Sequence, residues 1–300
     1  MNTRALVTGA GGFIGRAVMN RLSAARIEAI SLGSRPAAMN GHTHIQMEFP
    51  ARPEILSSIL HQIQPDMILH LAAAPPGADA ATHRDITQDF AFALFESAEK
   101  TVPHARIVTL GSAAEFGTGA QTHRAMTEAD LCAPVSAYGQ AKYHVTREAE
   151  RRWKNGQNMI AARLFTAFGP DMPLHTALGH AAHQIHAQPD TGGTLSMGDL
   201  NVERDYLDVD EVAAIIVQLA GGAARDIPLV HIASGKSFHL GRIVEDMIRL
   251  SGKKFNISQA KAPSLPIIPK IYGAPELLHK SGLFPKIADN FAIAHRIICS

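Results

Sequence analysis

A glycine-rich turn between a short apolar strand and a helical pattern is the feature that most constrains how this chain folds. The run Arg4-Ala5-Leu6-Val7 is followed by Thr8-Gly9-Ala10-Gly11-Gly12-Phe13-Ile14-Gly15, and a helical pattern then continues through Ala25. This order places helix amides against a phosphate, and the glycines let the backbone approach it. We therefore predict a dinucleotide site that includes Gly9, Gly12, Phe13, Ile14 and Gly15.

Strand-like and helix-like runs alternate after this turn. Strands are expected at residues 27–32, 44–49, 66–71, 105–110, 159–164 and 229–233, and helices include one at residues 53–63 and one that begins at Glu211 after an Asp210 cap. Strands that alternate with helices predict an α/β fold with a doubly wound parallel sheet of the Rossmann type.

We expect two parts in the chain. Residues 1–165, with residues 207–233 returning to them, are predicted to form a dinucleotide-binding domain. Residues 166–206 and 234–300, which are richer in loops and prolines, are predicted to form a smaller, discontinuous C-terminal substrate-binding subdomain. A substrate would lie between that subdomain and the carboxyl edge of the sheet.

The segment Ala137-Tyr138-Gly139-Gln140-Ala141-Lys142 carries the candidate chemistry. On a helix, Tyr138 and Lys142 are an i,i+4 pair that shares one face. A cation within about 4–6 Å lowers the pKa of a phenol from about 10 towards the catalytic range. Ser112, at the end of an apolar strand, is placed to hydrogen-bond the oxygen that Tyr138 protonates. The set predicts reduction of a carbonyl or oxidation of an alcohol, although Tyr-x-x-x-Lys also occurs by chance on surface helices.

The end of the second strand distinguishes the two nicotinamide cofactors. An NAD site usually has Asp or Glu there, whereas this chain has Gly33-Ser34-Arg35. Ser34 and Arg35 suit a 2′-phosphate, which favours NADP(H) over NAD(H); the alternative is a solvated loop arginine. The run Leu71-Ala72-Ala73 is rich in small residues, as expected where a cofactor crosses the strand ends.

Composition excludes several other classes. The 28 basic and 27 acidic residues give a net charge of +1 without long single-sign runs, which argues against nucleic-acid or membrane surfaces. Cys132 and Cys299 lie far apart, so no disulfide framework is expected. His180, His183 and His186 have no neighbouring acid, so no metal site is predicted. No signal peptide or membrane span is predicted, and we expect a cytoplasmic protein.

The stretch Phe90-Ala91-Phe92-Ala93-Leu94-Phe95 reads as a helix that is apolar nearly all round. One face of a sheet cannot cover such a helix on both sides. We predict a homodimer in which this helix and the helix of Tyr138 pack against their mates. The alternative is burial by a long loop of the same subunit.

With these motifs in place, the sequence from Thr8 through Pro285 resembles the extended short-chain dehydrogenase/reductase family. The family comprises NAD(P)-dependent nucleotide-sugar epimerases, dehydratases and reductases. Its Gly-x-x-Gly-x-x-Gly motif corresponds to the three glycines of the first turn. The resemblance implies that Ser112 and Tyr138 contact the reacting oxygen and that Lys142 also binds the nicotinamide ribose.

Two segments, residues 111–117 and 198–209, are most similar to the branch that reduces GDP-4-keto-6-deoxymannose. That resemblance implies that Arg204 binds the diphosphate of a nucleotide. Sugar dehydratases of the family carry acidic residues directly after the catalytic Ser or Thr, where this chain has Ala113 and Ala114. Glu115 comes one place too late, so dehydration is disfavoured.

Two departures concern the substrate. The Arg-x-Phe-Asn of the family becomes Arg163-Leu164-Phe165-Thr166, and Tyr272 replaces a second diphosphate-binding arginine, with Lys270 as a partial substitute. A lost arginine removes a charge-assisted hydrogen bond of roughly 1.5–3 kcal/mol. The departures therefore suggest a substrate other than an ordinary nucleotide sugar. The residues predicted to contact the substrate are Thr166, Arg204 and Tyr272.

The resulting hypothesis is an NADP-dependent reductase that acts on the 4-keto group of a nucleotide sugar. The alternatives are a nucleotide-sugar 4-epimerase, which would keep its cofactor bound, and a ketoreductase on a non-nucleotide substrate in secondary metabolism. A cofactor-sensing regulator is a further alternative, but such relatives usually lack the tyrosine or the lysine that this chain retains.

Overall fold

The computed structural model of the chain describes residues 3–34, 42–260 and 267–299. Its centre is a seven-stranded sheet with the strand order β11-β6-β5-β4-β1-β2-β3, and every neighbouring pair is parallel. The strands of this sheet are β1 (Arg4–Thr8), β2 (Glu28–Gly33), β3 (Thr43–Gln46), β4 (Met67–His70), β5 (Arg106–Ser112), β6 (Met159–Leu164) and β11 (Leu229–Ile232). The predicted doubly wound parallel sheet is therefore confirmed.

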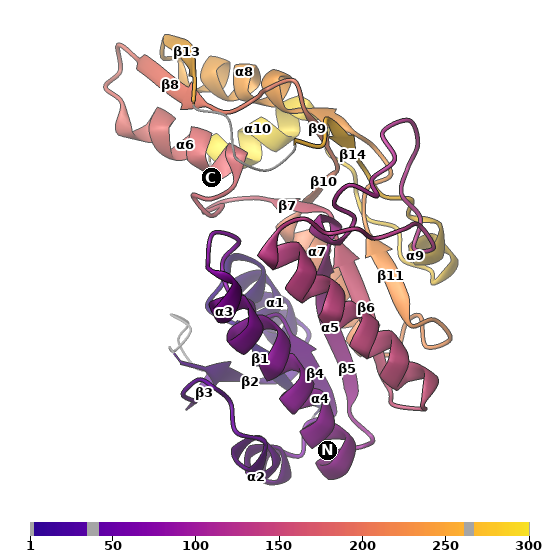
Figure 1. The fold of residues 1–300 in the computed structure, drawn as a ribbon. Helices are drawn as coiled ribbons and strands as arrows, with labels where there is room; N and C mark the ends of the chain where they lie inside the picture. The colour runs from indigo at the N-terminus through magenta and orange to yellow at the C-terminus, as the bar shows by residue number, and fades with distance from the viewer. Residues whose placement is uncertain (1–2, 35–41, 261–266, 300) are drawn as a thin grey trace.

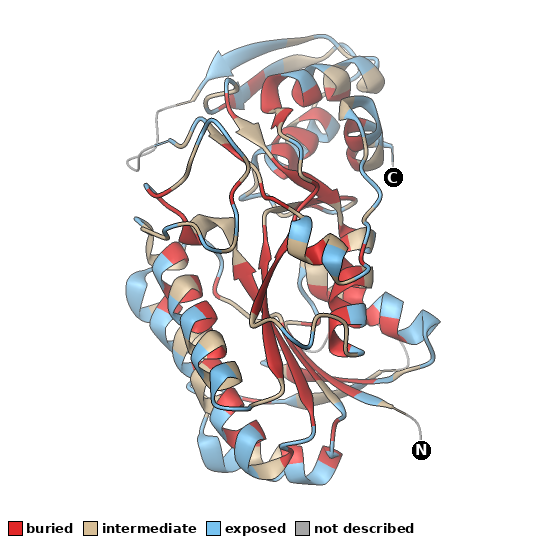
Figure 2. Ribbon diagram, turned by 90° about the vertical axis from the view of Figure 1, so that its right-hand side faces the viewer, coloured by how far each residue is buried: buried red, intermediate tan, exposed pale blue. Residues whose placement is uncertain are grey.

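Helices cover both faces of this sheet (Figures 1 and 2). The helices on one face are α1 (Phe13–Ala24) and α7 (Val209–Ala220), and those on the other are α2 (Pro53–Ile63), α4 (Phe90–Thr101) and α5 (Ala137–Lys154). Side chains of β1 alternate between the two layers, because Ala5 and Val7 join the core with α1 and α7 while Leu6 joins the core with α2 and α4.

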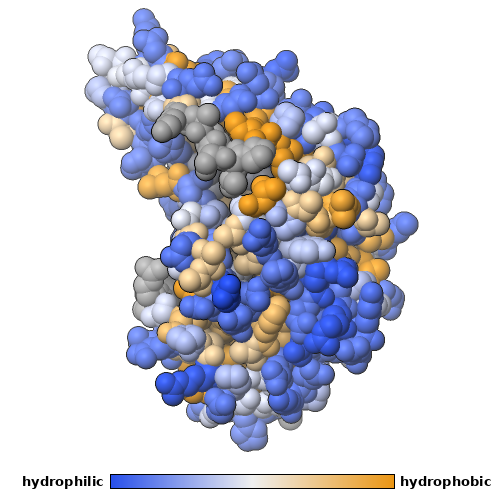
Figure 3. All heavy atoms as spheres, in the orientation of Figure 1, coloured by the Kyte–Doolittle hydropathy of each residue, from blue (hydrophilic) through white to orange (hydrophobic). Residues whose placement is uncertain are grey.

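Within the described residues, the apolar surface of α4 is covered largely by the chain itself. Phe90, Ala91, Leu94 and Phe95 are at most 1% exposed and share one core cluster with residues of α2 and α5. The outer surface over α5 is mainly hydrophilic in the view of Figure 3. The inference that this helix requires a second subunit is therefore wrong, because α2 and α5 supply the cover. The homodimer itself stays a prediction.

A smaller unit lies above the carboxyl edge of the sheet in Figure 1 and has its own apolar core. Three small sheets, with the strand orders β12-β9-β14, β10-β7 and β13-β8, belong to this region. Their strands are β7 (Thr166–Phe168), β8 (Gly193–Met197), β9 (Glu203–Arg204), β10 (Tyr206–Asp208), β12 (Phe238–His239), β13 (Phe255–Gln259) and β14 (Lys270–Ile271). Helices α6 (Ala177–Ala187), α8 (Leu240–Ser251) and α10 (Asn290–Ile298) share the apolar core of this unit, and the short α9 (Glu276–Lys280) precedes α10.

Two local expectations need correction. Helix α7 begins at Val209, and its cap is Asp208, whose carboxylate accepts a hydrogen bond from Asp210 N at 2.8 Å. Asp210, the expected cap, instead lies in the first turn of the helix. Leu278 and Leu283 join the core of the large sheet, so the segment around α9 packs on that sheet although it follows residue 234. Across the described part of the chain, no helix combines the length and apolar character needed to cross a bilayer.

Candidate active site

The turn between β1 and α1 fits tightly against the end of β4. Gly9 has φ of +72°, and a Cβ there would lie 2.7 Å from the backbone N of Ala72. A Cβ on Gly15 would lie 2.1 Å from the carbonyl oxygen of Gly9. Glycine is required at both positions because any side chain would displace backbone. This close packing is the reason for the glycine motif and leaves the amides at the start of α1 free to face an anion.

A cavity of about 580 Å³ lies along this turn. Six of the residues predicted to bind the cofactor line it: Gly9, Gly12, Ser34, Leu71, Ala72 and Ala73. Phe13, Ile14 and Gly15 form the first turn of α1 and are not among its lining residues. Arg35 lies outside the described residues, so its predicted contact with a 2′-phosphate is not tested. The cavity has the place and the backbone geometry of a dinucleotide site.

Three polar residues of this cavity were missed by the sequence reasoning: Arg16, Ser31 and His44. The side chains of Ser31 and His44 are hydrogen-bonded at 2.9 Å between Oγ and Nδ1, and Nε2 of His44 is buried without a hydrogen-bond partner in the described part of the chain. Arg16 follows the last glycine of the motif, which is a signal that sequence could have used. Nothing in the sequence indicates His44, because its place depends on the pairing of β2 with β3.

Helix α5 carries Tyr138 and Lys142 in its first turns, so the expected i,i+4 pair is present. The Ser136 side chain caps this helix by accepting a hydrogen bond from Gly139 N at 3.0 Å. A Cβ on Gly139 would lie 2.6 Å from the carbonyl oxygen of Ala114, so the helix packs directly on the segment after β5. This contact brings Tyr138 near Ser112, whose side chain favours the ionised phenol.

The electrostatics of this pair differ from the expectation. Burial raises the pKa of Tyr138, the hydrogen bond with Ser112 lowers it, and the charge of Glu115 raises it further. The Lys142 ammonium donates a hydrogen bond to the carbonyl oxygen of Leu110 at 2.7 Å, and burial lowers the pKa of Lys142 to about 8. The expected lowering of the Tyr138 pKa is therefore wrong for the protein alone, because burial of the phenol outweighs the hydrogen bond that favours the phenolate.

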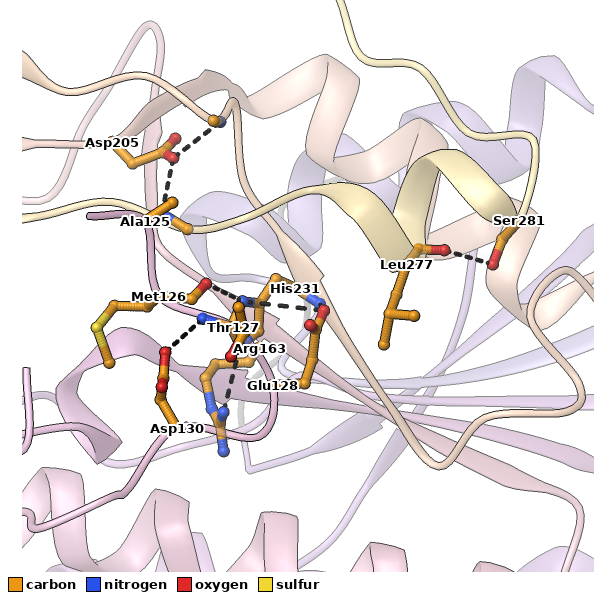
Figure 4. A network of polar contacts seen from close by, with 12 residues as sticks. Ala125, Met126, Thr127, Glu128, Asp130, Arg163, Asp205, His231, Leu277 and Ser281 are labelled. Atoms are coloured by element: carbon orange, nitrogen blue, oxygen red, sulfur yellow. Dashed lines mark hydrogen bonds and ion pairs between the residues drawn. The ribbon is translucent and has the colours of Figure 1, made fainter. Parts of the chain in front are cut away.

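A buried ion pair lies directly behind Ser112. Glu115 is fully buried, and its Oε2 is 2.8 Å from Nη2 of Arg163 on β6. Arg163 in turn donates a hydrogen bond from Nη1 to Nε2 of His231 at 3.3 Å, and His231 lies 3.1 Å from the carbonyl oxygen of Met126 through Nδ1 (Figure 4). These contacts engage Glu115 in the core, consistent with the expectation that it is not a dehydratase acid.

His83 is a second buried residue at the site that sequence reasoning missed. It opens a π-helical turn (His83–Asp89) before α4, a geometry that is frequent at functional sites. Its ring centroid lies 5.7 Å from that of Tyr138, and the residue is 1% exposed. Neither ring nitrogen has a hydrogen-bond partner among the described residues. A buried imidazole with two unpaired nitrogens is costly unless a ligand or water satisfies it.

The three predicted substrate residues come from adjoining strands. Arg204 ends β9, and Tyr272 directly follows β14, which pairs with β9. Thr166 begins β7, where it pairs with Tyr206 on β10. The chain after Ser112 reaches the same strands, since Met126 N donates a hydrogen bond to the Tyr272 carbonyl at 2.8 Å. The topology thus gathers these residues around one end of the sheet, although none of them is among the described residues that line the cavity of the glycine turn.

Lys270 was considered as a substitute for the missing arginine. Its ammonium lies 3.0 Å from Glu203 and 5.3 Å from the centre of the Tyr272 ring. Both contacts already stabilise the ammonium, so Lys270 should bind a diphosphate more weakly than an arginine without such contacts. Within the described residues, no group of three or more histidine, cysteine or acidic side chains is placed to hold a metal ion.

Comparisons with known proteins show which proteins this chain is similar to. The family model described as the NAD dependent epimerase/dehydratase family matches residues 5–228. The chain is 28% identical over 266 residues to the dTDP-6-deoxy-L-talose 4-dehydrogenase (NAD(P)(+)) of Kitasatospora kifunensis, covering 87% of this chain and 83% of the relative. It is also 27% identical over 266 residues to the 2'-dehydrokanamycin reductase of Streptomyces kanamyceticus, covering 84% of this chain and 68% of the relative.

The fold has solved counterparts. The UDP-glucose 4-epimerase of Thermus thermophilus, determined in complex with NAD, superposes with a TM-score of 0.84. The two chains are 20% identical, and the match covers 98% of this chain and 97% of the other. At this level of identity the likeness concerns the fold.

Proposed function

The chain belongs to the NAD-dependent epimerase/dehydratase family, and on that premise we propose that it is an NADP-dependent reductase of the 4-keto group of a nucleotide-activated sugar. The observation that supports this proposal is the meeting of Ser112, Tyr138 and Lys142 at the end of β5. This strand pairs with β4, whose end packs against the glycine turn. The similarity to a dTDP-sugar 4-dehydrogenase supports a reaction at carbon 4 of the sugar, since reduction of a 4-keto group is the reverse of that dehydrogenation.

The roles of the three side chains follow from their chemistry. When bound, NADPH supplies a hydride. Tyr138 donates a proton to the developing alkoxide, and its raised pKa keeps the phenol protonated at neutral pH. Ser112 hydrogen-bonds the same oxygen and polarises the carbonyl. Lys142 binds the ribose of the cofactor and supplies positive charge near the phenol, as the family resemblance implies.

The cavity also supports NADP over NAD. Among the described residues that line it there is no carboxylate, whereas Arg16, Ser34 and His44 are present. A carboxylate at this position binds the ribose hydroxyls of NAD and repels a 2′-phosphate. Positive and hydroxyl groups bind that phosphate instead. The unpaired Nε2 of His44 is a further donor or acceptor available to this end of the cofactor.

One second candidate has specific support. Thr166 and Tyr272 replace residues that the family uses for nucleotide sugars, and Lys270 is engaged by Glu203. The similarity to a reductase of a kanamycin derivative points to a glycosidic ketone without a nucleotide. A ketoreductase on such a substrate would use Ser112 and Tyr138 in the same way.

The test is NADPH consumption with a panel of ketones. The panel holds dTDP-, GDP- and UDP-linked 4-keto-6-deoxy sugars and a keto-aminoglycoside, and the Tyr138→Phe variant is the control. Turnover of a nucleotide-linked sugar that the variant lacks supports the proposal. Turnover of the aminoglycoside alone favours the second candidate. Tightly bound cofactor with interconversion of 4-epimers, and no net NADPH consumption, would show a 4-epimerase instead.

We also propose that the protein is a cytoplasmic homodimer. Light scattering at micromolar concentration tests the subunit count, and a monomer there would contradict it. The unpartnered part of α4 is small, since only Phe92 and Ala93 of its first two turns are half-exposed within the described structure. A dimer would therefore rest mainly on polar contacts of α4 and α5.

A further inference from the structure

Glu115 contacts both elements that carry the catalytic residues, β5 with Ser112 and α5 with Tyr138 and Lys142. Its Oε1 accepts a hydrogen bond from the backbone N of Ser112 at 2.7 Å and one from the Thr146 hydroxyl at 2.9 Å. Thr146 lies on α5, one turn after Lys142 and two turns after Tyr138. A single carboxylate oxygen thus joins the end of β5 to the helix of the proton donor.

The second oxygen of Glu115 is held from the opposite side. Oε2 accepts a hydrogen bond from Nε of Arg163 at 2.9 Å and lies 2.8 Å from its Nη2. The guanidinium also lies over the Phe116 ring, 4.8 Å from its centre. The remaining nitrogen of the guanidinium, Nη1, donates a hydrogen bond to Nε2 of His231. Nε2 is therefore the acceptor, and Nδ1 of the same ring is the donor to the Met126 carbonyl. Both carboxylate oxygens are therefore held by directed bonds.

The packing leaves Glu115 no alternative position. The side chains of Glu115 and Arg163 are 0% and 2% exposed. A Cβ on Gly111 would lie 2.7 Å from Oε1 of Glu115 and 2.9 Å from Oγ1 of Thr146, so the strand approaches this pair as closely as glycine allows. A fully paired buried carboxylate in such a pocket is rigid, because any rotation would break charged hydrogen bonds in a medium that cannot replace them.

We propose that Glu115, anchored by Arg163, is a positioning residue that sets the geometry of Ser112 and Tyr138 and the electrostatic field at the phenol. Its bonds determine where the Ser112 backbone lies relative to α5. Its charge opposes loss of the Tyr138 proton and favours the charged form of Lys142. Burial is the larger cause of the raised pKa of Tyr138, and Glu115 adds to it, so both favour the phenol form that donates a proton.

The charged and titratable groups around the phenol are few within the described residues. His83 on the π-helical turn packs against the Tyr138 ring, and Glu115 and Lys142 act from the segment after β5 and from α5 itself. Burial, with a smaller contribution from the charge of Lys142, lowers the pKa of His70 on β4 to about 3, so that ring is neutral. Among these groups, Glu115 is the one whose charge raises the pKa of Tyr138, so a change in the Tyr138 titration when Glu115 is replaced is attributed to the loss of its charge.

The experiment compares two double variants and a control. Glu115→Gln with Arg163→Met removes both charges but keeps an oxygen that accepts from Ser112 N. Glu115→Met with Arg163→Met removes that acceptor as well. Neither leaves one charge alone in the core, which would be strongly destabilising. Arg106→Met is the control, since Arg106 is also a buried arginine, lies at the opposite end of β5 and bonds to Leu219 O, Ala223 O and Asn158.

The first readout is the ionisation of Tyr138, followed by absorbance in an alkaline titration. Each protein is titrated with and without the Tyr138→Phe substitution, and the difference between the two curves is the Tyr138 signal. We expect the Tyr138 midpoint to fall in the Gln/Met variant, because the charge of Glu115 raises the pKa of Tyr138 and the charge of Arg163 is not among the causes of that shift. In Arg106→Met the midpoint should stay in place. An unchanged midpoint in a folded Gln/Met variant would overturn the proposal. This titration needs no substrate, so it stands apart from the reductase assignment on which the kinetic readout rests.

The second readout is kcat with whichever ketone is turned over. We expect the Met/Met variant to lose roughly 100-fold in kcat, since a shift of about 1 Å at the reacting groups costs that much, while the KM for NADPH changes little. The Gln/Met variant should retain more activity than Met/Met because Ser112 N keeps its acceptor. Equal kcat in Met/Met and Arg106→Met would show a purely structural role.

Discussion

The ammonium of Lys142 lies 2.7 Å from the carbonyl oxygen of Leu110 and donates a hydrogen bond to it. This bond fastens α5 to β5 two residues before Ser112, at the point where the phenol of Tyr138 meets the Ser112 side chain. The helix, the strand and the reacting groups are therefore joined before any cofactor binds, which is the preorganisation that carbonyl reduction requires.

Because Lys142 is buried with a pKa lowered to about 8, NADPH binding should weaken as the pH rises through that value. Below it the ammonium is charged and can bind the ribose, and above it the charge is lost. Fluorescence titration of NADPH at several pH values between about 7 and 9.5 measures this, given the lowered lysine pKa. In Lys142→Met the affinity should be lower and should not change across this range; a parallel pH dependence in that variant would contradict the prediction.

Replacement of Tyr138 by Phe should lower kcat by about 1,000-fold or more, since a positioned general acid contributes roughly 10²–10⁴-fold. The ring is retained, so its packing against His83 is kept. The dissociation constant of NADPH should stay within a few-fold of the parent value. Steady-state kinetics and equilibrium binding decide this together, and turnover equal to that of the parent would refute the assignment of Tyr138.

Arg16 should contribute to NADP preference because it lines a cavity whose described lining residues include no carboxylate. Asp171, 3.9 Å from its guanidinium, is not among those lining residues. In Arg16→Ala, NADPH affinity should fall about 10-fold to 150-fold, which corresponds to a charged hydrogen bond of roughly 1.5–3 kcal/mol. NADH affinity should change little. Arg21→Ala is the matched control, because Arg21 lies in the last turn of α1 and does not line the cavity. Equal losses for both cofactors would place Arg16 elsewhere than at the 2′-phosphate.

His83→Phe should separate stability from activity. Phenylalanine keeps the ring contact with Tyr138 and removes two unpaired buried nitrogens, so the unliganded protein should gain about 1–3 kcal/mol in the free energy of unfolding. If a ring nitrogen hydrogen-bonds substrate or cofactor, kcat/KM should fall about tenfold or more at the same time. Denaturant unfolding and kinetics measure the two effects. A variant that is neither more stable nor less active would show that solvent already satisfies the imidazole.

The protein should begin to lose stability at a pH near 6.5, which is higher than the pH at which carboxylates titrate. Burial lowers the pKa of His70 and of His231 to about 3, with the charges of Lys142 and Arg163 acting in the same direction. The unfolded chain takes up these protons near pH 6.5, so the stability is present above that pH and is lost as pH falls towards 3. Each histidine contributes at most about 5 kcal/mol over this window.

The His70→Asn variant tests this prediction. Asparagine can keep a hydrogen bond to the Thr8 hydroxyl, which lies 2.9 Å from Nδ1 of His70, but it does not titrate. Between about pH 7 and 4.5 the free energy of unfolding should therefore depend less steeply on pH in the variant, by close to one proton. Identical slopes in the two proteins would exclude His70 as a source of acid lability.

The elements that sequence predicted correctly are those whose signals are local. Helix α2 begins and ends at the expected residues, and the six-residue strand β6 does as well, because apolar periodicity and flanking turns lie in consecutive positions. The cap of α7 was misplaced by two residues because Asp208 and Asp210 have the same capping ability and only the backbone decides between them. The argument for a dimer from α4 failed because periodicity does not reveal which neighbours cover a helix.

The sequence by itself determined the glycine turn, the order of strands and helices, and the spacing that puts Tyr138 and Lys142 on one helical face. Only the tertiary structure decided the environment of those groups. Arg163 bonds to Glu115 although 48 positions separate them in the sequence. Tyr138 of α5 packs against His83 of the π-helical turn, a different segment of the chain. The physical reason is range: backbone geometry responds to adjacent residues, whereas burial and charge depend on segments that only the folded chain brings together.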